Sequence, residues 1–393
     1  MNMEFFAESL AEICSHSLIA PGRPLRWVII ANPCAGGFVM RSRREKSRRM
    51  LEKCRAAARE NSLRDDCMPA QTAAARLVND SAAALAACGL IPTRGPDCAA
   101  EITGQLMNEV SAALDNAGTD STQSPVLQAM PFYLLITAGG DGTFRGALSV
   151  LYHAPASVRS NIAILRLPLG TGNDGADFPQ LDLSLELLIK PSQINFTPAL
   201  RLLPAPGGPA DRLCRSKGLF LAFNILSVGL DAFVTHMTNK MKGKFPGDFY
   251  KLWVDIASLL YDRLYKVGFL DVRALDGQGR EALSFREKLL LLAVGVSGHR
   301  TYGSQKKILP DDRNVCAIKQ MSLLRKLALK DLFAVGGHIS KPESILFNAH
   351  RVEISSEYPI LAQMDGEAVL LQKEDFPAVI ELSEPVIPVL IFG

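Results

Sequence analysis

Three glycine-bearing loops, each directly behind an apolar run, constrain this chain more than any other feature. The runs cover residues 25–31, 132–138 and 162–167, and their apolar and β-branched side chains indicate buried strands. The loops that follow them are Asn32-Pro33-Cys34-Ala35-Gly36-Gly37, Gly139-Gly140-Asp141-Gly142-Thr143 and Pro168-Leu169-Gly170-Thr171-Gly172-Asn173-Asp174. Parallel strands place such loops at one carboxyl edge of a sheet, where ligands bind.

The residue types in these loops suit a bound phosphate. Glycine permits positive φ and lets a bulky anion approach the backbone closely. Where a strand opens into a helix, free backbone N–H groups and the helix dipole both favour an anion, and Thr143 can cap the helix that follows. A tight strand-to-helix turn without a ligand remains the alternative for any single loop. Three such loops in succession favour an anion site.

These three loops resemble those of the diacylglycerol kinase catalytic family, which also covers sphingosine and ceramide kinases and bacterial lipid kinases. The resemblance continues at residues 224–232 and 364–367, so it spans most of residues 25–371. It implies an ATP- and Mg²⁺-dependent kinase that phosphorylates the hydroxyl of diacylglycerol or of a related lipid such as a sphingoid base. Such an enzyme serves lipid metabolism, including phospholipid biosynthesis.

The sequence also departs from the family pattern. Arg145 and Gly146 stand where many bacterial members carry an Asn-Glu pair, and residues 297–303 lack most of the family's glycines. The acidic turn Asp311-Asp312 is followed by Arg313 in place of a glycine. These changes concern the acceptor pocket and a structural metal more than the nucleotide site.

The resemblance implies that ATP lies on the three loops, with Asn32 and Thr171 as side-chain contacts and Asp141 holding the catalytic Mg²⁺. A turn-stabilising hydrogen bond is the alternative role for Asp141, and helix capping near residue 178 is the alternative for Asn173 and Asp174. The residues expected to bind the nucleotide are Asn32, Pro33, Cys34, Ala35, Gly36, Gly139, Gly140, Asp141, Gly142, Thr143, Gly170, Thr171, Gly172 and Asn173.

By the same resemblance, the turn Asp365-Gly366-Glu367 carries the proton acceptor. We expect Glu367 to act as the base, with Asp365 orienting it and Asp141 as the alternative base. A hairpin turn would explain Asp365-Gly366 without chemistry, whereas glutamate is depleted at strand positions such as 367. Asp312, beside Asp311, is expected to hold a second, structural Mg²⁺.

The order of strand-like and helix-like segments predicts two domains. Residues 1–24 form an N-terminal extension, and residues 25–190 form an α/β ATP-binding domain with a mostly parallel sheet and an Ala-rich insertion at 61–125. Residues 191–371 form a β-rich, sandwich-like acceptor domain. Residues 372–393 return to the first domain, as in the family.

Composition limits the partners and the location. The net charge of +3 is too small to indicate nucleic acid, and the eight cysteines show no spacing for zinc or for a disulfide framework. We therefore expect a cytoplasmic protein. The longest apolar run, 289–296, falls short of the ~20 residues of a spanning helix, so the lipid must be reached from the membrane surface.

Two segments bear on that surface. The basic run 41–59 could attract nucleotide phosphates and anionic lipid, and the alternative is that it forms an ordinary solvated helix face. Residues 240–253 mix lysines with aromatic residues, which suits an anionic membrane interface, whereas the apolar stripe of 249–265 equally suits a core helix. A homodimer is a further expectation.

Two other functions remain open. One is a kinase of a soluble acceptor similar to NAD kinase, which shares a Gly-Gly-Asp-Gly-Thr loop. The other is a nucleotide- or lipid-binding homologue that has lost catalysis, which Arg145, Gly146 and Arg313 keep open.

Overall fold

The computed structural model describes residues 1–64, 76–77, 88–118, 130–170, 173–218, 220–241, 261–302 and 306–393. The chain divides into two compact units. The first contains Met1–Thr197 and Pro385–Gly393, and the second contains Pro198–Glu384. Each unit is described by itself.

The sheet of the first unit is mostly parallel. Its strand order is β2-β3-β1-β4-β5-β20-β6, and only β6 runs antiparallel to its neighbour. The strands are β1 Leu25–Ala31, β2 Arg76–Leu77, β3 Gly89–Pro92, β4 Phe132–Gly139, β5 Ile162–Pro168, β6 Ser192–Thr197 and β20 Ile387–Phe392. Because β1, β4 and β5 lie inside the sheet, their side chains are almost all buried, which explains their continuous apolar runs.

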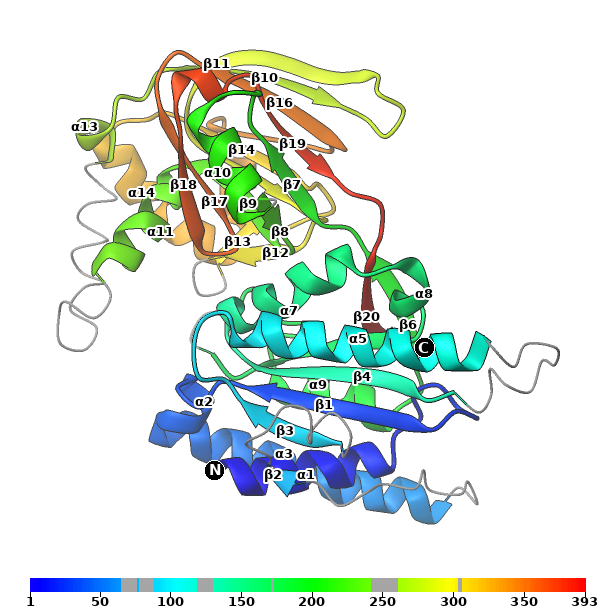
Figure 1. Ribbon diagram of the computed structural model, residues 1–393. Helices are drawn as coiled ribbons and strands as arrows, with labels where there is room; N and C mark the ends of the chain where they lie inside the picture. The colour runs from blue at the N-terminus through cyan, green and yellow to red at the C-terminus, as the bar shows by residue number, and fades with distance from the viewer. Residues whose placement is uncertain are drawn as a thin grey trace. The chain divides into compact units, whose positions relative to one another are not determined.

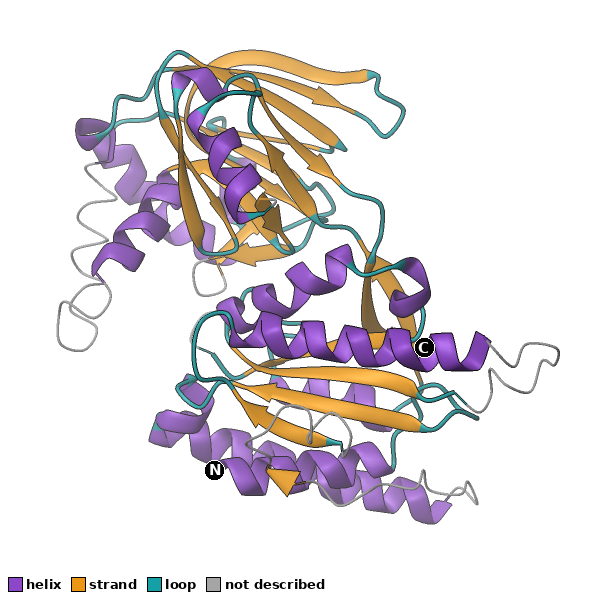
Figure 2. Ribbon diagram, viewed as in Figure 1, coloured by secondary structure: helices purple, strands orange, loops and turns teal. Residues whose placement is uncertain are grey.

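Helices cover both faces of this sheet (Figures 1 and 2). On one face α1 Met3–Ser15, α3 Arg41–Arg64 and α9 Leu181–Ile189 share a buried core with alternate residues of β1, β4 and β5. On the other face lie α5 Cys98–Gly118 and α7 Asp141–His153, with the short α8 Ala156–Arg159. The short α2 Gly36–Val39 follows the first loop.

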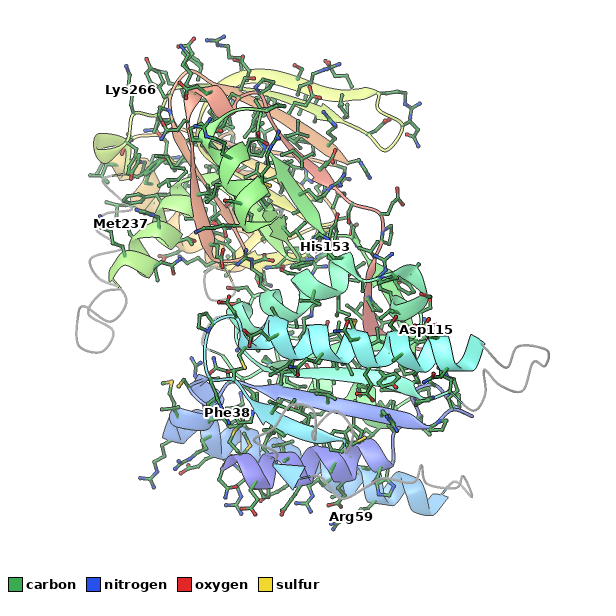
Figure 3. The ribbon with its side chains drawn as sticks, viewed as in Figure 1. Phe38, Arg59, Asp115, His153, Met237 and Lys266 are labelled. Atoms are coloured by element: carbon green, nitrogen blue, oxygen red, sulfur yellow. The ribbon has the colours of Figure 1, made fainter. Side chains whose placement is uncertain are left out.

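The N-terminal segment, expected as an extension, is part of this core. Phe6, Leu10 and Ile13 of α1 are fully buried, and Phe6 meets the ring of Phe38 edge-on at 5.1 Å between centroids. Phe38 lies on α2 beside the first loop (Figure 3). Helix α1 therefore supports the element that carries this loop.

The second unit is built around an antiparallel sheet of eleven strands among the described residues. Its main path is β18-β17-β9-β11-β10-β16-β19-β7-β8, and β14 and β15 branch from β11. The strands are β7 Leu200–Leu203, β8 Phe220–Ala222, β9 Ile225–Gly229, β10 Phe269–Leu275, β11 Glu281–Gly295, β14 Val315–Lys319, β15 Ser344–Phe347, β16 Arg351–Ser356, β17 Ile360–Met364, β18 Glu367–Leu371 and β19 Ala378–Leu382.

Strand β11 joins the two halves of this sheet. Its first part pairs with β10, and residues Leu291–Gly295 pair with β9 while Leu289–Val294 pair with β14. A separate hairpin joins β12 Arg300–Tyr302 to β13 Lys306–Leu309. The helices are α10 Pro209–Lys217, α11 Leu230–Met241, α13 Tyr261–Leu264 and α14 Leu323–Val335, with 3₁₀ turns η1 Gly337–Ser340 and η2 Lys373–Asp375.

The predicted fold class, a mostly parallel α/β domain followed by a β-rich domain, is confirmed. The structure divides the chain at 197/198 and 384/385, whereas the sequence placed these boundaries at 190/191 and 371/372. Residues 65–75, 78–87 and 119–125 of the expected insertion, and 242–253 of the basic-aromatic segment, lie outside the described residues. Within the described part of the chain, no helix is both long and apolar enough to span a membrane.

Candidate functional site

The three loops meet at one edge of the first unit's sheet because their strands end in register. Ala31 of β1 pairs with Ala138 of β4, and Gly139 of β4 pairs with Pro168 of β5. The chain leaves β1 toward β3 on one side and returns to β4 on the other. This reversal of strand order is the point at which open α/β sheets bind ligands, beyond the carboxyl ends of the strands.

Backbone hydrogen bonds join the loops directly. The N–H of Asn32 donates to the carbonyl of Ala138 at 2.9 Å, and the N–H of Leu169 donates to that of Gly139 at 3.1 Å. The N–H of Gly37 donates to the carbonyl of Leu169 at 2.8 Å. The first loop is thus bonded to the end of β4 and to the third loop, and the second loop is bonded to the third.

Two glycines allow the third loop to approach its neighbours, Gly170 toward the second loop and Gly37 toward the third loop from the first. A Cβ added at Gly170 would overlap the Cα of Gly140 and would lie 2.9 Å from its nitrogen. A Cβ at Gly37 would likewise lie 2.7 Å from Cδ2 of Leu169. Glycine is required here by the close contact between the loops.

The first loop is shaped by its own side chains. Oδ1 of Asn32 accepts the N–H of Cys34 at 2.9 Å, an Asx turn that starts the loop. Ala35 then stands in extended conformation at the N-cap of α2, which Gly36 begins. Asn32 therefore orders the loop, and a further contact of Asn32 with a nucleotide stays a proposal.

The second loop runs directly into α7. Gly140 is the N-cap, and its carbonyl accepts the N–H groups of Thr143 and Phe144. Asp141 lies in the first turn of the helix, and its Oδ1 accepts the N–H of Gly175 at 2.8 Å. Asp141 thus holds the segment that follows the third loop, a long-range contact that differs from the local turn-stabilising bond foreseen as its alternative role.

The position of Asp141 also fits a nucleotide-bound Mg²⁺. Mg²⁺ in kinase sites is held by one or two carboxylates together with substrate phosphates and water. The described residues contain no cluster of three or more His, Cys, Asp or Glu side chains arranged for a metal. Asp141, beside the glycine loops, matches the sparse protein ligation of that kind of site.

The third loop is held by contacts that the sequence did not predict. Asn173 has a left-handed backbone with φ of 60°, and its Nδ2 donates to the carbonyl of Gly170 at 3.0 Å. Further on, Asp177 binds Arg166 of β5 through the backbone N–H and the guanidinium, with an Nη2–Oδ1 distance of 2.6 Å. Their side chains are only 9% and 5% exposed. The sequence feature that could have indicated this pair is the single arginine, Arg166, inside the apolar run 162–167, because a buried arginine needs an acidic partner.

Two predicted nucleotide ligands of this loop, Thr171 and Gly172, lie outside the described residues. The other predicted ligands in the three loops are all brought to the same sheet edge.

In the second unit, Asp365 has a structural role. It begins the turn between β17 and β18, and both Asp365 and Gly366 have positive φ, 44° and 95°, as a two-residue hairpin requires. Its carboxylate accepts backbone N–H groups from Phe223, Asn224 and Ile225. Asp365 therefore fixes the connection between β8 and β9 to this hairpin.

Glu367 follows that turn as the exposed first residue of β18, opposite Met364. A buried polar network lies beneath the turn. Ser227 donates to Asp231 at 2.6 Å, and Nε2 of Gln363 donates to both at 2.9 Å. Oε1 of Gln363 accepts the N–H of Gly366 at 3.0 Å. These contacts hold the turn that precedes Glu367. The role of Glu367 as base stays a proposal.

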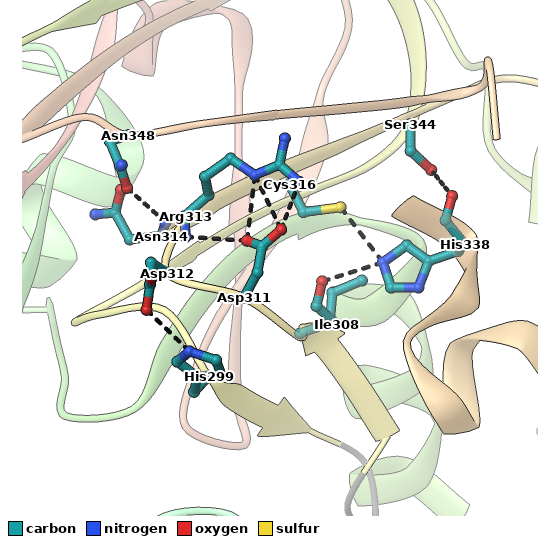
Figure 4. A network of polar contacts seen from close by, with 10 residues as sticks. All are labelled: His299, Ile308, Asp311, Asp312, Arg313, Asn314, Cys316, His338, Ser344 and Asn348. Carbon is teal, nitrogen blue, oxygen red and sulfur yellow. Dashed lines mark hydrogen bonds and ion pairs between the residues drawn. The ribbon is translucent and has the colours of Figure 1, made fainter. Parts of the chain in front are cut away.

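The acidic turn 311–312 does not fit a structural Mg²⁺. Asp311 binds Arg313 through the guanidinium and accepts its backbone N–H at 3.0 Å (Figure 4). The hydrogen bond from Arg313 lowers the pKa of Asp311. Asp312 is 98% exposed and contacts Nε2 of His299 at 2.9 Å. Arg313 thus supplies the positive charge next to Asp311, and no third metal-ligating group joins Asp312 among the described residues.

Nearby, Cys316 and His338 form a buried contact of 3.8 Å between Sγ and Nε2 (Figure 4). Burial raises the pKa of Cys316 to about 12 and lowers the pKa of His338. Both groups are therefore held neutral, which is the opposite of what a thiolate nucleophile with a histidine partner needs.

Residues 103–191 match the diacylglycerol kinase catalytic domain family. This match contains the second and third loops but not the first. No curated protein matches the chain significantly.

Among solved structures, a protein described as a "putative diacylglycerol kinase from Bacillus anthracis str. Sterne" aligns with a TM-score of 0.52 at 15% identity, covering 94% of this chain and 95% of its own. A second structure of that description aligns with a TM-score of 0.49 at 16% identity, over 94% and 97%. Yeast NADH kinase complexed with NADH reaches only 0.34 at 12% identity, over 94% and 83%. Only the first likeness has a TM-score above 0.5, and at 15% identity it shows the fold alone.

The match over 103–191 confirms the resemblance drawn from the sequence for the second and third loops: this segment is similar to a diacylglycerol kinase catalytic domain, and the first likeness shows that the fold is shared.

Proposed function

We propose that the chain transfers the γ-phosphoryl group of ATP to the hydroxyl of a lipid, diacylglycerol or a sphingoid base, with Mg²⁺. The observation that carries this proposal is the convergence of the three loops. Gly37, Leu169 and Gly139 are linked by hydrogen bonds, and Gly170 lies against Gly140 without room for a side chain. Phosphoryl transfer depends mainly on positioning and charge neutralisation, and a rigid backbone cradle at a sheet edge supplies positioning.

The residues have separate roles in this proposal. Backbone N–H groups of the loops and the N-terminus of α7 receive the phosphates. Asp141 would hold Mg²⁺, which would supply charge neutralisation for the phosphates. Glu367 accepts the proton of the lipid hydroxyl, and Asp365 holds the hairpin from which Glu367 projects. The protein works in the cytoplasm at a membrane surface, and we propose a homodimer as its assembly.

The test is a turnover assay with γ-labelled ATP and Mg²⁺. Three acceptors are offered separately: diacylglycerol in mixed micelles, sphingosine in mixed micelles, and NAD⁺ in solution. We expect label in the lipid phase with one of the first two and none in NAD⁺, with Asp141→Asn as the inactive control. Label in NAD⁺ alone would establish the soluble-acceptor kinase instead. ATP binding without transfer to any acceptor would establish an inactive homologue.

A further inference from the structure

One arginine of the basic helix α3 differs from its neighbours in what it contacts. Arg41 pairs with Glu45, Arg48 with Glu52, and both Arg55 and Arg59 with Glu12. Arg43, like Arg44 and Arg49, forms no ion pair among the described residues, but its Nη1 donates to the backbone carbonyl of Gly170 at 3.0 Å. What sets Arg43 apart is therefore its contact with the third loop, made by a guanidinium that no carboxylate of the described residues pairs with.

Arg43 also touches the first loop. A Cβ added at Gly36 would lie 3.3 Å from Nη1 of Arg43 and 3.6 Å from its Cδ. The guanidinium consequently lies against Gly36 of the first loop while it bonds Gly170 of the third. Gly37, the next residue, donates to Leu169 in the same region. Arg43 thus spans two of the loops that converge on the candidate nucleotide site.

The carbonyl of Gly170 explains why a cation is useful there. A carbonyl oxygen carries partial negative charge and would repel a phosphate brought close to it. This carbonyl accepts two hydrogen bonds, from Nη1 of Arg43 and from Nδ2 of Asn173 at 3.0 Å each. Both of its lone pairs are then occupied.

We propose that Arg43 is a positioning residue for the nucleotide phosphates. It holds the Gly170 carbonyl away from them and places an uncompensated positive charge beside the loops. The inference rests on the proposed ATP site but not on the identity of the phosphate acceptor. Arginine suits the task because its planar fork offers five N–H donors, so one can hold Gly170 while others remain for an anion. Lysine, a compact point charge, would keep the charge but not this geometry.

The test compares nucleotide binding by four full-length proteins: wild type, Arg43→Ala, Arg43→Lys and Arg44→Ala. Arg44 is the matched control, because its replacement removes one charge from the adjacent position of the same helix. Calorimetry measures the dissociation constants of ATP, ADP and adenosine, and thermal unfolding shows that each variant is folded. We expect Arg43→Ala to weaken ATP and ADP binding about tenfold, the size of a lost charge-assisted hydrogen bond. Adenosine binding should change by less than about twofold, as should all binding to Arg44→Ala, and Arg43→Lys should fall between wild type and Arg43→Ala.

Three results would overturn the inference. They are unchanged ATP affinity in Arg43→Ala, an equal loss in Arg44→Ala, and an equal loss of adenosine affinity. The first would show that Arg43 does not contribute to nucleotide binding. The second would show that any positive charge on this helix has the same effect. The third would show that the substitution disturbs the structure of the site and not its contact with phosphate. A wild type that binds ATP but phosphorylates no lipid would contradict the proposed lipid kinase and leave this inference standing. A wild type that binds no nucleotide would overturn both.

Discussion

Arg166 and Asp177 form a buried ion pair, with Nη2 and Oδ1 2.6 Å apart, that ties the end of the third loop back to strand β5. Asp177 also accepts the backbone N–H of Arg166 at 2.6 Å. Arg166 stands two residues before the third loop and Asp177 three residues after it. The role of the pair is to keep the loop in place.

Removing one member of this pair should cost far more than removing a surface pair. Asp177→Leu leaves the guanidinium buried without a counter-charge, so we expect the free energy of unfolding to fall by about 3 kcal/mol. Glu45→Gln is the control. It breaks the Arg41–Glu45 pair, whose side chains are 87% and 54% exposed, and should cost no more than about 0.5 kcal/mol. Urea unfolding measures both, and equal small losses would show that the Arg166–Asp177 pair does not stabilise the unit.

The contact between Gly140 and Gly170 predicts a specific loss of nucleotide binding. Gly170→Ala places a Cβ where it overlaps the Cα of Gly140, so the second and third loops must separate. We expect at least a tenfold rise in the dissociation constant of ATP, which is about 1.4 kcal/mol. Gly104→Ala in α5 is the control, because a Cβ there has open space and alanine favours a helix. Wild-type ATP affinity in folded Gly170→Ala would show that the close contact is not needed.

Asp141→Asn separates the metal role of Asp141 from its structural role. Asparagine keeps an Oδ1 that can accept the N–H of Gly175, so the bond between the second and third loops survives. We therefore expect an unchanged thermal midpoint together with a drop in turnover of at least about tenfold, or 1.4 kcal/mol in barrier. When the initial rate is measured against Mg²⁺ concentration, the variant should need more Mg²⁺ than the wild type to reach its half-maximal rate. Normal turnover at saturating ATP and Mg²⁺ would contradict the metal role of Asp141.

Local patterns predicted the fold class and the convergence of the loops, because both follow from strand order and from residue types next to one another in the chain. Strand β11 shows where this reasoning ends. The apolar run 289–296 marks its second half, but the strand starts at Glu281, because the first half alternates exposed and half-buried positions and pairs with β10. The contacts of Arg43 with Gly170 and of Asp365 with Ile225 join residues 127 and 140 positions apart. Such pairings depend on tertiary structure, and no local motif records them.

His338 predicts a pH dependence of stability in the second unit. It is fully buried, stacks on Phe333 at 4.5 Å between centroids, and its Nε2 contacts the carbonyl of Ile308 at 3.1 Å. Burial lowers its pKa below 6.5, the ordinary histidine value that applies to an unfolded chain. Because the pKa of His338 is lower in the folded state, neutral His338 contributes its full stability to the fold above pH 6.5. This contribution is lost as the pH falls from 6.5 toward the pKa of the folded state.

Thermal unfolding between pH 8 and pH 5 tests this expectation. When the unfolded state binds one proton more than the folded state, the free energy of unfolding changes by about 1.4 kcal/mol per pH unit. As the pH is lowered from 6.5, we expect the unfolding temperature of the wild type to decrease and that of His338→Phe to decrease less. His350→Phe is the control, because His350 is exposed. Parallel pH profiles for wild type and His338→Phe would assign the acid sensitivity to other groups.

The role of Glu367 as proton acceptor is tested by Glu367→Gln, which keeps the size and the backbone of β18 while removing the charge. The turn that presents Glu367 should persist, because Asp365 and Gln363 hold it through backbone N–H groups. We therefore expect a slower chemical step with unchanged affinities for ATP and lipid, the pattern of a lost general base. Glu374→Gln, an exposed glutamate in η2, is the matched control.

Single-turnover kinetics at saturating ATP and lipid distinguish this expectation from its alternative. If phosphoryl transfer here is so loose that it needs little base catalysis, positioning by the three loops carries the rate. The Glu367→Gln rate would then lie within about twofold of wild type, a barrier change of only ~0.4 kcal/mol. That result would remove Glu367 from the chemistry and leave Asp141 as the remaining candidate base. A rate lowered tenfold or more, with Glu374→Gln unchanged, would instead place the proton acceptor on the hairpin that Asp365 anchors to Ile225.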